Sequence, residues 1–163
     1  MAEPTQIWLT QIAFDRLTDE LAERSGPLRR EIAIRIGLAR EEGDLRENGG
    51  YHAAKEDQGK NEARIRQLQH ILDNAQIGTP PEAASGKATQ GTVVTVRFAD
   101  GDTDTFLLAS HEEARHATLD VCSPTSPLGS AVLDRAVGDS ASYELPSGQA
   151  LVVEIIEVRR YEV

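Results

Sequence analysis

The feature that most constrains the fold is a regular repeat between about Asn48 and Ala75. Positions that suit a helix–helix seam alternate by three and four residues: Tyr51, Ala54, Gln58, Asn61, Ile65, Leu68, Leu72 and Ala75. This spacing is typical of a coiled coil, so the segment is predicted to be one long helix packed on another. Gln58 and Asn61 are the polar members, and we expect them to fix the register rather than to bind a ligand.

The partner helix is predicted upstream, from Thr10 to about Arg40. Its apolar positions recur at helical spacing: Leu17, Leu21, Leu28, Ile32, Ile36 and Ala39. Thr10 can cap the start of this helix. Pro27 lacks a backbone N–H, so the helix must kink or break near residues 23–26; one kinked helix and two short helices remain alternatives.

The segment 43–50, GDLRENGG, separates the two helical runs. Its glycines break both helices, and a short connection predicts that the helices pack antiparallel. Helices of about 28–31 residues, at about 1.5 Å per residue, predict a rod of about 40–45 Å. A rod of that length does not fold back into a compact core, so its turn is predicted to lie far from the rest of the chain.

Beyond Ala75 the periodicity changes from helical to two. Strands are predicted at 92–98, 105–109, 119–122, 140–145 and 150–158. A turn is predicted at 99–102, and a short helix with Ser126 as its cap and Pro127 at its first position is predicted to end near Leu133. The fold class is therefore α+β: an N-terminal antiparallel α-helical coiled-coil hairpin and a C-terminal antiparallel sheet with one short helix. We divide the chain into residues 1–77, a linker at 78–88, and residues 89–163.

The charge of the chain limits its partners. The 163 residues have a net charge of −10, with 27 acids and 17 Lys and Arg. Such an acidic chain is a poor candidate for binding free nucleic acid, which depends on clustered cations. The start of the chain has no signal-peptide pattern, no apolar stretch is long enough to span a membrane, and the single Cys122 fits a reducing compartment. We therefore expect a cytoplasmic protein.

Two acids in the turn, Asp44 and Glu47, are not expected to stabilise the fold. They lie three residues apart at the far end of the predicted rod, where crowded carboxylates repel one another. Such a pair suits a cation that another molecule supplies, and Mg²⁺ needs only one or two protein carboxylates. Two carboxylates without a substrate cleft do not make an enzyme, so we expect no unaided catalysis.

The segment 43–59, GDLRENGGYHAAKEDQG, resembles the signature of the bacterial Gre family of transcript-cleavage factors, and within it the GreA branch. The C-terminal half adds three matching segments: SPTSPLG at 123–129, VGD at 137–139 and LPSG at 145–148. The likeness covers nearly the whole chain in order. Lys55 and Asp57 are conservative departures, at positions where Arg and Glu or Gln are expected.

The resemblance implies a mechanism and partners. Gre factors have an N-terminal coiled coil that enters the secondary channel of RNA polymerase, and an FKBP-like C-terminal domain that docks at the channel rim. The tip acids help to hold a second Mg²⁺ in the active site of a backtracked polymerase, which then hydrolyses the RNA near its 3′ end. By position, Asp44 and Glu47 are these acids, Arg40 and Lys55 contact the extruded RNA, and Ser126, Pro127 and Leu128 are candidates for docking.

The resemblance also implies a monomer with no cofactor of its own, which acts as an accessory factor and shares Mg²⁺ with the polymerase. One alternative is a Gre-like inhibitor that binds the same channel without promoting cleavage. Another is a prolyl isomerase or chaperone. Four aromatic residues that are not clustered argue against an isomerase pocket: Phe98, Phe106, Tyr143 and Tyr161.

Three other residue types are given structural roles. We expect His52 and His70 to be surface residues, since neither has metal-ligand spacing with Cys122. Cys122 is expected to be buried rather than reactive. Trp8 is expected to anchor the start of the first helix against Leu9, Ile12 or the end of the second helix.

Overall fold

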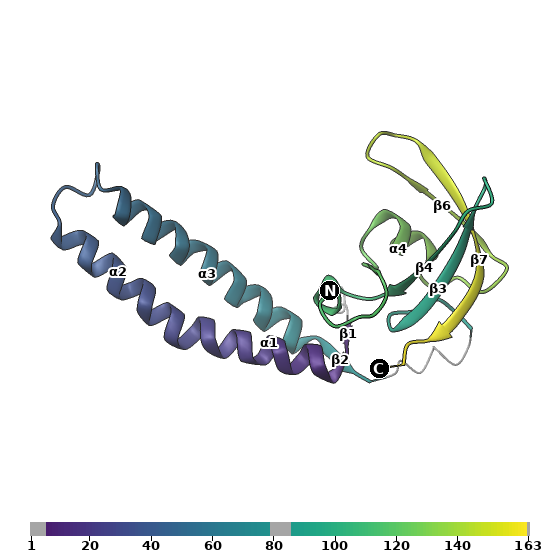
Figure 1. Ribbon diagram of the computed structural model, residues 1–163, viewed down its shortest axis with the longest axis horizontal. Helices are drawn as coiled ribbons and strands as arrows, with labels where there is room; N and C mark the ends of the chain where they lie inside the picture. The colour runs from purple at the N-terminus through teal and green to yellow at the C-terminus, as the bar shows by residue number, and fades with distance from the viewer. Residues whose placement is uncertain (1–5, 79–85, 163) are drawn as a thin grey trace, which may run out of the picture. The chain divides into compact units, whose positions relative to one another are not determined.

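The computed structural model describes residues 6–78 and 86–162, and its elements form two compact units (Figure 1). One unit is the helical hairpin of residues 14–74; the other joins the described residues before 14 to those after 74. The predicted limits 1–77 and 89–163 follow the change of periodicity and stay a prediction. Most of the predicted linker, residues 79–85, lies outside the described residues. No helix in the described parts of the chain has the length and apolar character needed to cross a membrane.

The hairpin consists of two antiparallel helical arms. The first arm is α1 (Gln11–Glu23), a turn of π-helix (Arg24–Leu28) and α2 (Arg29–Glu41); the second is α3 (Gly49–Asp73). Thr10 caps α1 as predicted, because its Oγ1 accepts the N–H of Ala13 at 3.2 Å. The predicted hairpin is therefore confirmed. Its second arm of 25 residues is about 37 Å long at about 1.5 Å per residue.

The predicted seam holds the two arms together. On α3 the buried residues are Ala54, Asn61, Ile65, Leu68 and Ile71. Across the seam, Leu17, Ile32, Ile36 and Ala39 are buried. The prediction was wrong at the end of α3, where Ile71 is buried and Leu72 is only half-buried.

The proline is accommodated without a break. Pro27 lies inside the π turn, and the backbone stays helical from Gln11 to Glu41. In an α-helix, the carbonyl four residues before a proline has no N–H to accept from. A π turn pairs each carbonyl with the N–H five residues ahead, so this carbonyl has another donor. Ser25 adds a hydrogen bond from its hydroxyl to the Leu21 carbonyl at 2.7 Å. Of the two alternatives left open by the sequence, the structure therefore has one continuous helical arm, with a π turn at the proline, and not two separate helices.

A charged network crosses the hairpin next to this turn. Glu20 Oε1 accepts from Arg24 Nε at 2.8 Å and from Arg64 Nε on α3 at 2.9 Å, and Glu20 Oε2 accepts from Arg64 at 3.0 Å. The hydrogen bonds from Arg64, opposed by partial burial and joined by the bond from Arg24, lower the pKa of the Glu20 carboxyl from 4.5 to about 2. The carboxylate therefore stabilises the folded hairpin when it is ionised.

The start of the chain contributes a strand that the sequence did not reveal. Strand β1 (Ile7–Leu9) pairs in parallel with β2 (Ala75–Ile77). Trp8 lies in β1 rather than in a helix, so its expected packing was wrong: its ring meets Tyr161 edge-on at 6.3 Å, and its indole N–H donates to the Gly78 carbonyl. Strands of three residues are too short to show a period, and their pairing partners are far apart in sequence.

The C-terminal sheet has five strands in the order β5-β4-β3-β7-β6. The strands are β3 (Thr92–Phe98), β4 (Thr103–Leu108), β5 (Val121–Cys122), β6 (Ser140–Glu144) and β7 (Ala150–Arg160). All neighbours are antiparallel except β4 and β5, which run parallel. A 3₁₀ turn (His111–Glu113) and the helix α4 (Pro127–Val132) lie between strands. The predicted fold class is confirmed.

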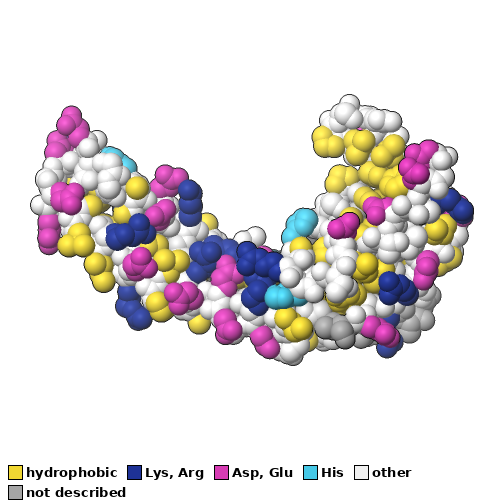
Figure 2. Space-filling view, viewed as in Figure 1, with side chains coloured by type: hydrophobic (Ala, Val, Ile, Leu, Met, Phe, Trp, Pro, Cys, Tyr) yellow, Lys and Arg dark blue, Asp and Glu magenta, His cyan; other side chains and the backbone are white. Residues whose placement is uncertain are grey.

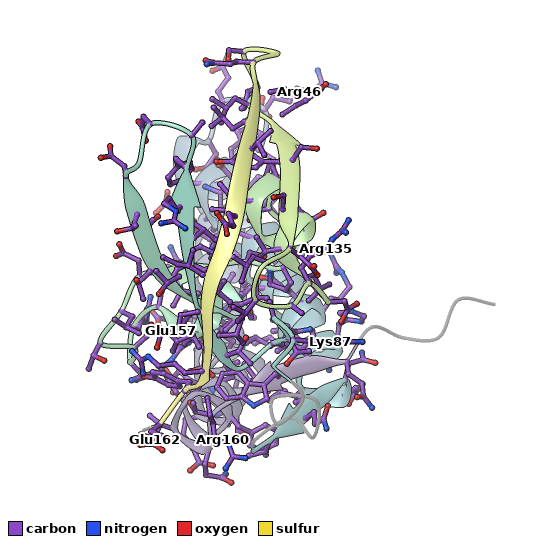
Figure 3. The ribbon with its side chains drawn as sticks, turned by 90° about the vertical axis from the view of Figure 1, so that its right-hand side faces the viewer. Arg46, Lys87, Arg135, Glu157, Arg160 and Glu162 are labelled. Atoms are coloured by element: carbon purple, nitrogen blue, oxygen red, sulfur yellow. The ribbon has the colours of Figure 1, made fainter. Side chains whose placement is uncertain are left out.

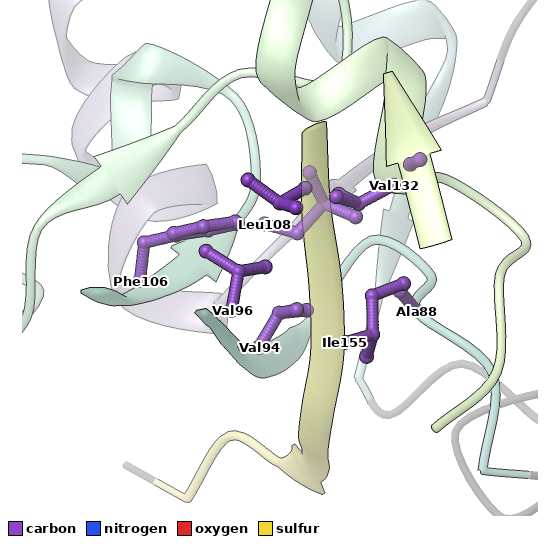
Figure 4. Close-up of a cluster of buried hydrophobic side chains, with 9 residues drawn as sticks. Ala88, Val94, Val96, Phe106, Leu108, Val132 and Ile155 are labelled. Carbon is purple, nitrogen blue, oxygen red and sulfur yellow. The ribbon is translucent and has the colours of Figure 1, made fainter. Parts of the chain in front are cut away.

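The sheet has a packed core on each face because strand side chains alternate. One face carries the cluster drawn in Figure 4, in which Val94, Phe106 and Ile155 meet Val132 of α4. On β3 and β4 the alternate residues Val93 and Leu107 join Trp8 in a second cluster. The aromatic residues are not scattered, contrary to expectation: Phe98, Phe106 and Tyr143 all belong to the first cluster.

We predict that Gly129 in α4 does not tolerate a side chain. A Cβ there would lie 1.9 Å from the Ser123 carbonyl oxygen, so Gly129→Ala forces the backbone apart and costs roughly 1–3 kcal/mol or more. Gly37 in α2 is the matched control: a Cβ there meets nothing within 4 Å, and an exposed helical Gly→Ala change stabilises by about 0.5–1 kcal/mol. Urea unfolding measures both, and equal effects of the two changes would contradict this packing.

The pKa of Glu20 predicts a pH-dependent hairpin stability. Because the folded pKa is lowered, this contribution is fully present above pH 4.5 and is lost as the pH falls towards 2. We expect Glu20→Gln to lower the free energy of unfolding by about 1–2 kcal/mol at pH 7, after solvent screening, and by much less at pH 3. Urea titrations followed by circular dichroism give the difference. A difference in unfolding free energy between wild type and Glu20→Gln that stays constant from pH 7 to pH 3 would refute the stabilising role of the Glu20 carboxylate. Glu62→Gln, which changes an exposed pair with Arg29, is the control.

Candidate functional site

The candidate site is the connection between α2 and α3. Helix α2 ends at Glu41 and α3 begins at Gly49, so residues 42–48 form the end of the hairpin opposite to its first and last residues. Gly43 has a φ of +123°, a conformation that side-chain-bearing residues rarely adopt, and it turns the chain out of α2. Acidic side chains gather at this end of the hairpin (Figure 2).

Asn48 fixes the connection in two ways. Its Oδ1 accepts the N–H of Tyr51 at 3.0 Å and so caps α3. Its Nδ2 donates to the Ala39 carbonyl at 2.6 Å, near the end of α2. One carboxamide therefore satisfies a free donor of one helix and a free acceptor of the other, and it ties the two arms together at the base of the turn.

Both predicted acids are exposed on the turn. Asp44 has one local role that the sequence analysis missed: its Oδ1 accepts the N–H of Arg46 at 3.0 Å and closes a tight turn. Neither the Asp44 Oδ2 nor the Glu47 carboxylate has such a bond to any residue that the structure describes. Within residues 6–78 and 86–162, neither acid takes part in an ion pair, and the intervening Arg46 side chain extends into solvent (Figure 3).

The donor set at the tip consists of carboxylate oxygens, which are ligands that Mg²⁺ prefers. Oxygen atoms of two exposed carboxylates are available, and no cation of the described chain neutralises them. The described residues contain no group of three or more His, Cys, Asp and Glu that could hold an ion together. Since Mg²⁺ accepts one or two carboxylates and completes its shell with water or substrate oxygens, the pair could add ligands to an ion held elsewhere.

The two predicted RNA contacts flank the turn, one on each arm. The Arg40 guanidinium, in the last turn of α2, lies 5.9 Å from the centroid of the Tyr51 ring, a cation–π contact. Lys55 on α3 donates to Gln58 Oε1 at 2.8 Å. Both cationic side chains are exposed, and neither forms an ion pair with a tip acid in the described structure.

The predicted docking residues have a clear role in the fold. Ser126 Oγ accepts the N–H of Gly129 at 3.1 Å, and Pro127 occupies the first turn of α4, as expected of a helix start. Leu128 packs against the first core cluster.

Cys122 is half-buried, and its burial raises the pKa of its thiol, which keeps the thiol in its less reactive, protonated form. His52 and His70 are exposed, as predicted.

Two residues that shape the site were not assigned this role from the sequence. Tyr51 lies under Arg40 and was predicted only as a seam residue, whereas Asn48 was known only as part of a motif. A signal for the cap was present, because Asn is a preferred residue immediately before a helix. The bond from Asn48 to Ala39 joins residues from different helices, and no local pattern predicts it.

Two family models match consecutive parts of this chain. The model for the N-terminal domain of transcription elongation factors GreA and GreB matches residues 7–77. The model for the GreA/GreB C-terminal domain matches residues 83–160.

Individual relatives agree over almost the full length. "Transcription elongation factor GreA" of Streptomyces coelicolor is 54% identical over 94% of this chain and 93% of its own. The protein of the same name from Saccharopolyspora erythraea is 52% identical over 99% of each chain. The chain therefore belongs to the GreA/GreB family of transcription elongation factors.

Solved structures of similar proteins also match over most of the chain. GreA factor homolog 1 of Thermus thermophilus is 27% identical, with 95% of this chain and 99% of that chain covered and a TM-score of 0.43. The GreA/GreB elongation factor of Nitrosomonas europaea is 20% identical, covers 95% of this chain and 98% of its own, and has a TM-score of 0.40.

We predict that Asn48 sets the order of the tip. Asn48→Ala removes both hydrogen bonds, so we expect a loss of about 1–2 kcal/mol in hairpin stability and faster hydrogen exchange at the Tyr51 amide. Asn48→Asp keeps the acceptor that caps α3 but loses the donor to Ala39. Its stability and its exchange rate are expected to lie between those of wild type and Asn48→Ala. Exchange rates equal to wild type in both variants would contradict the role of Asn48.

Proposed function

We propose that this chain binds RNA polymerase, inserts the tip of its hairpin into the secondary channel, and stimulates cleavage of backtracked RNA by the polymerase active site. It acts as a monomeric accessory factor in the cytoplasm. The observation that carries the proposal is the exposed, unneutralised pair Asp44 and Glu47 at the end of a stiff hairpin, in a chain that belongs to a family of transcription elongation factors.

The charge of the tip supports action on a cation. Carboxylates that stabilised only their own protein would be expected to have nearby Lys or Arg partners, as Glu20 has in the same hairpin. The tip acids have none in the described structure, and one Asp44 oxygen remains available beside the bond to Arg46. An incoming metal ion therefore has no internal salt bridge to displace.

The chemistry requires little more of this chain than two oxygen ligands and their position. A second Mg²⁺ in the polymerase supplies Lewis acidity and lowers the pKa of a bound water. Asp44 and Glu47 would contribute ligands to that ion, and Arg40 and Lys55 would contact the phosphates of the extruded RNA 3′ end. Asn48 and Gly43 hold the turn that presents the acids.

The length of the arms supports the proposal, because it places the tip far from the other end of the hairpin. About 37 Å of regular helix in α3 separates the tip from the other end of the hairpin, and the opposite arm is continuous through its π turn. In the proposal, Ser126, Pro127 and Leu128 take part in docking the C-terminal domain at the channel rim. Pro127 is exposed, and Ser126 and Leu128 are half-buried, so part of this segment is accessible to a partner.

The proposal predicts that both acids are required. Asp44→Asn and Glu47→Gln each remove a negative metal ligand, so we expect a loss of at least tenfold, about 1.4 kcal/mol, in the rate of stimulated RNA cleavage, with polymerase binding nearly unchanged. The assay follows shortening of labelled RNA in stalled, backtracked polymerase with Mg²⁺.

Glu42→Gln is the matched control, because it removes the same charge from an exposed residue of the same tip. It should retain cleavage. If the wild-type chain produces no shortening beyond polymerase alone, the proposal fails. Inhibition of transcription that survives Asp44→Asn would instead identify a channel plug.

A further inference from the structure

A cluster in the middle of the hairpin has a geometry that the proposed function does not yet use. Asn61 of α3 is 4% exposed, in the seam opposite the π turn. Its Nδ2 donates to the Arg24 backbone carbonyl at 3.0 Å, and its Oδ1 accepts from Arg24 NH1 at 3.2 Å. Asn61 therefore binds both the backbone and the side chain of the first residue of the π turn.

The π turn corrects a mismatch between the two arms. Ala39 lies 22 positions after Leu17 in the first arm, whereas six steps of a heptad seam, alternately three and four residues long, advance by about 21 positions. The seam of α3 keeps its alternation of three and four throughout. A π turn takes up one extra residue, so that Ile32 and Ile36 return to the face that packs on Ala54.

Without that turn, the tip half of the arm would be rotated. One residue in an α-helix corresponds to a rotation of roughly 100°. A regular α-helix through residues 24–28 would turn the Ile32–Ile36 face away from α3, and it would change the direction in which α2 enters the connection that carries Asp44 and Glu47. The π turn thus sets the rotational phase of the tip.

We propose that Asn61 is a positioning residue that holds the π turn and thereby sets the direction of the tip acids. Pro27 disfavours a regular α-helix at this turn, and Asn61 supplies a donor to the carbonyl of Arg24. Glu20 holds the Arg24 guanidinium from the other side, through the bond to its Nε. The inference rests on the proposed function for its effect on cleavage, but its structural part is independent of it.

The test replaces Asn61 by Leu, which keeps the seam occupied and removes both bonds. Spin labels at the exposed Ala33 and Ala63, in a Cys122→Ser background, report the rotation of α2 against α3; labels at Ala22 and Ala63 report the part of the hairpin before the turn. We expect the first distance to shift or broaden in Asn61→Leu and the second to remain as in wild type. Unchanged distances for both pairs would overturn the proposal.

Cleavage kinetics separate positioning from loss of fold. We expect Asn61→Leu to lower the maximal rate of stimulated cleavage about fivefold or more, while the concentration that gives half-maximal stimulation stays the same. Asn61→Asp, which keeps the acceptor for the Arg24 guanidinium but loses the donor to its carbonyl, should show the same distance change and so covers the case in which Asn61→Leu does not fold. Glu62→Gln, which removes the charge from the exposed pair with Arg29, is the control and should behave as wild type.

The outcomes distinguish this inference from the proposed function. A wild-type chain that stimulates no cleavage refutes the proposed function, while the distances still test Asn61. Full cleavage by Asn61→Leu with altered distances overturns the positioning role. A parallel rise in the half-maximal concentration and fall in the rate, with unchanged distances, also overturns it, because that pattern indicates weakened binding.

Discussion

The structure depends on the burial of one narrow seam between two antiparallel arms. Residues such as Leu17, Ile36 and Leu68 have no sheet or second layer to cover them within the hairpin, so the opposite arm must do so along its whole length. This constraint keeps the two arms side by side along their length. It leaves residues 42–48 at one end with little to pack against. The exposed tip is a consequence of this packing: a long hairpin needs a turn, and the turn cannot be buried within the hairpin.

Polar side chains also join the two arms of the hairpin. Asn48 joins the arms at the tip, and Asn61 joins them at the π turn, each with a carboxamide that both donates and accepts. Glu20 gathers two arginines from opposite arms. These side chains are satisfied inside the protein, whereas Asp44 retains an unbonded oxygen and Glu47 has no ion pair in the described structure. The contrast separates the acids that build the hairpin from the acids that are available to a partner.

Much of this arrangement could be predicted from the sequence, because the seam is a local, periodic signal. The hairpin, the five strands, the caps at Thr10 and Ser126 and the exposed tip follow from spacing and residue type. The strands β1 and β2 could not be predicted, since each has three residues and their pairing joins Ile7 to Ala75. Pro27 signalled an irregular helix, but whether it breaks, bends or forms a π turn depends on contacts with α3. At the candidate site, the position of Asp44 and Glu47 could be predicted from the motif and its glycines. The hydrogen bond between Asp44 and the Arg46 N–H, and the contact of Arg40 with Tyr51, could not.

The central claim is that the two tip carboxylates act by supplying ligands to an ion in another protein's active site. The most direct measurement is the Mg²⁺ dependence of RNA cleavage by backtracked polymerase, with and without this chain at saturating concentration. Added ligands bind the second ion more tightly, so the account predicts that the chain lowers the Mg²⁺ concentration needed for half-maximal cleavage and that Asp44→Asn abolishes this shift. An unchanged Mg²⁺ dependence, together with full stimulation of the rate, would contradict the account.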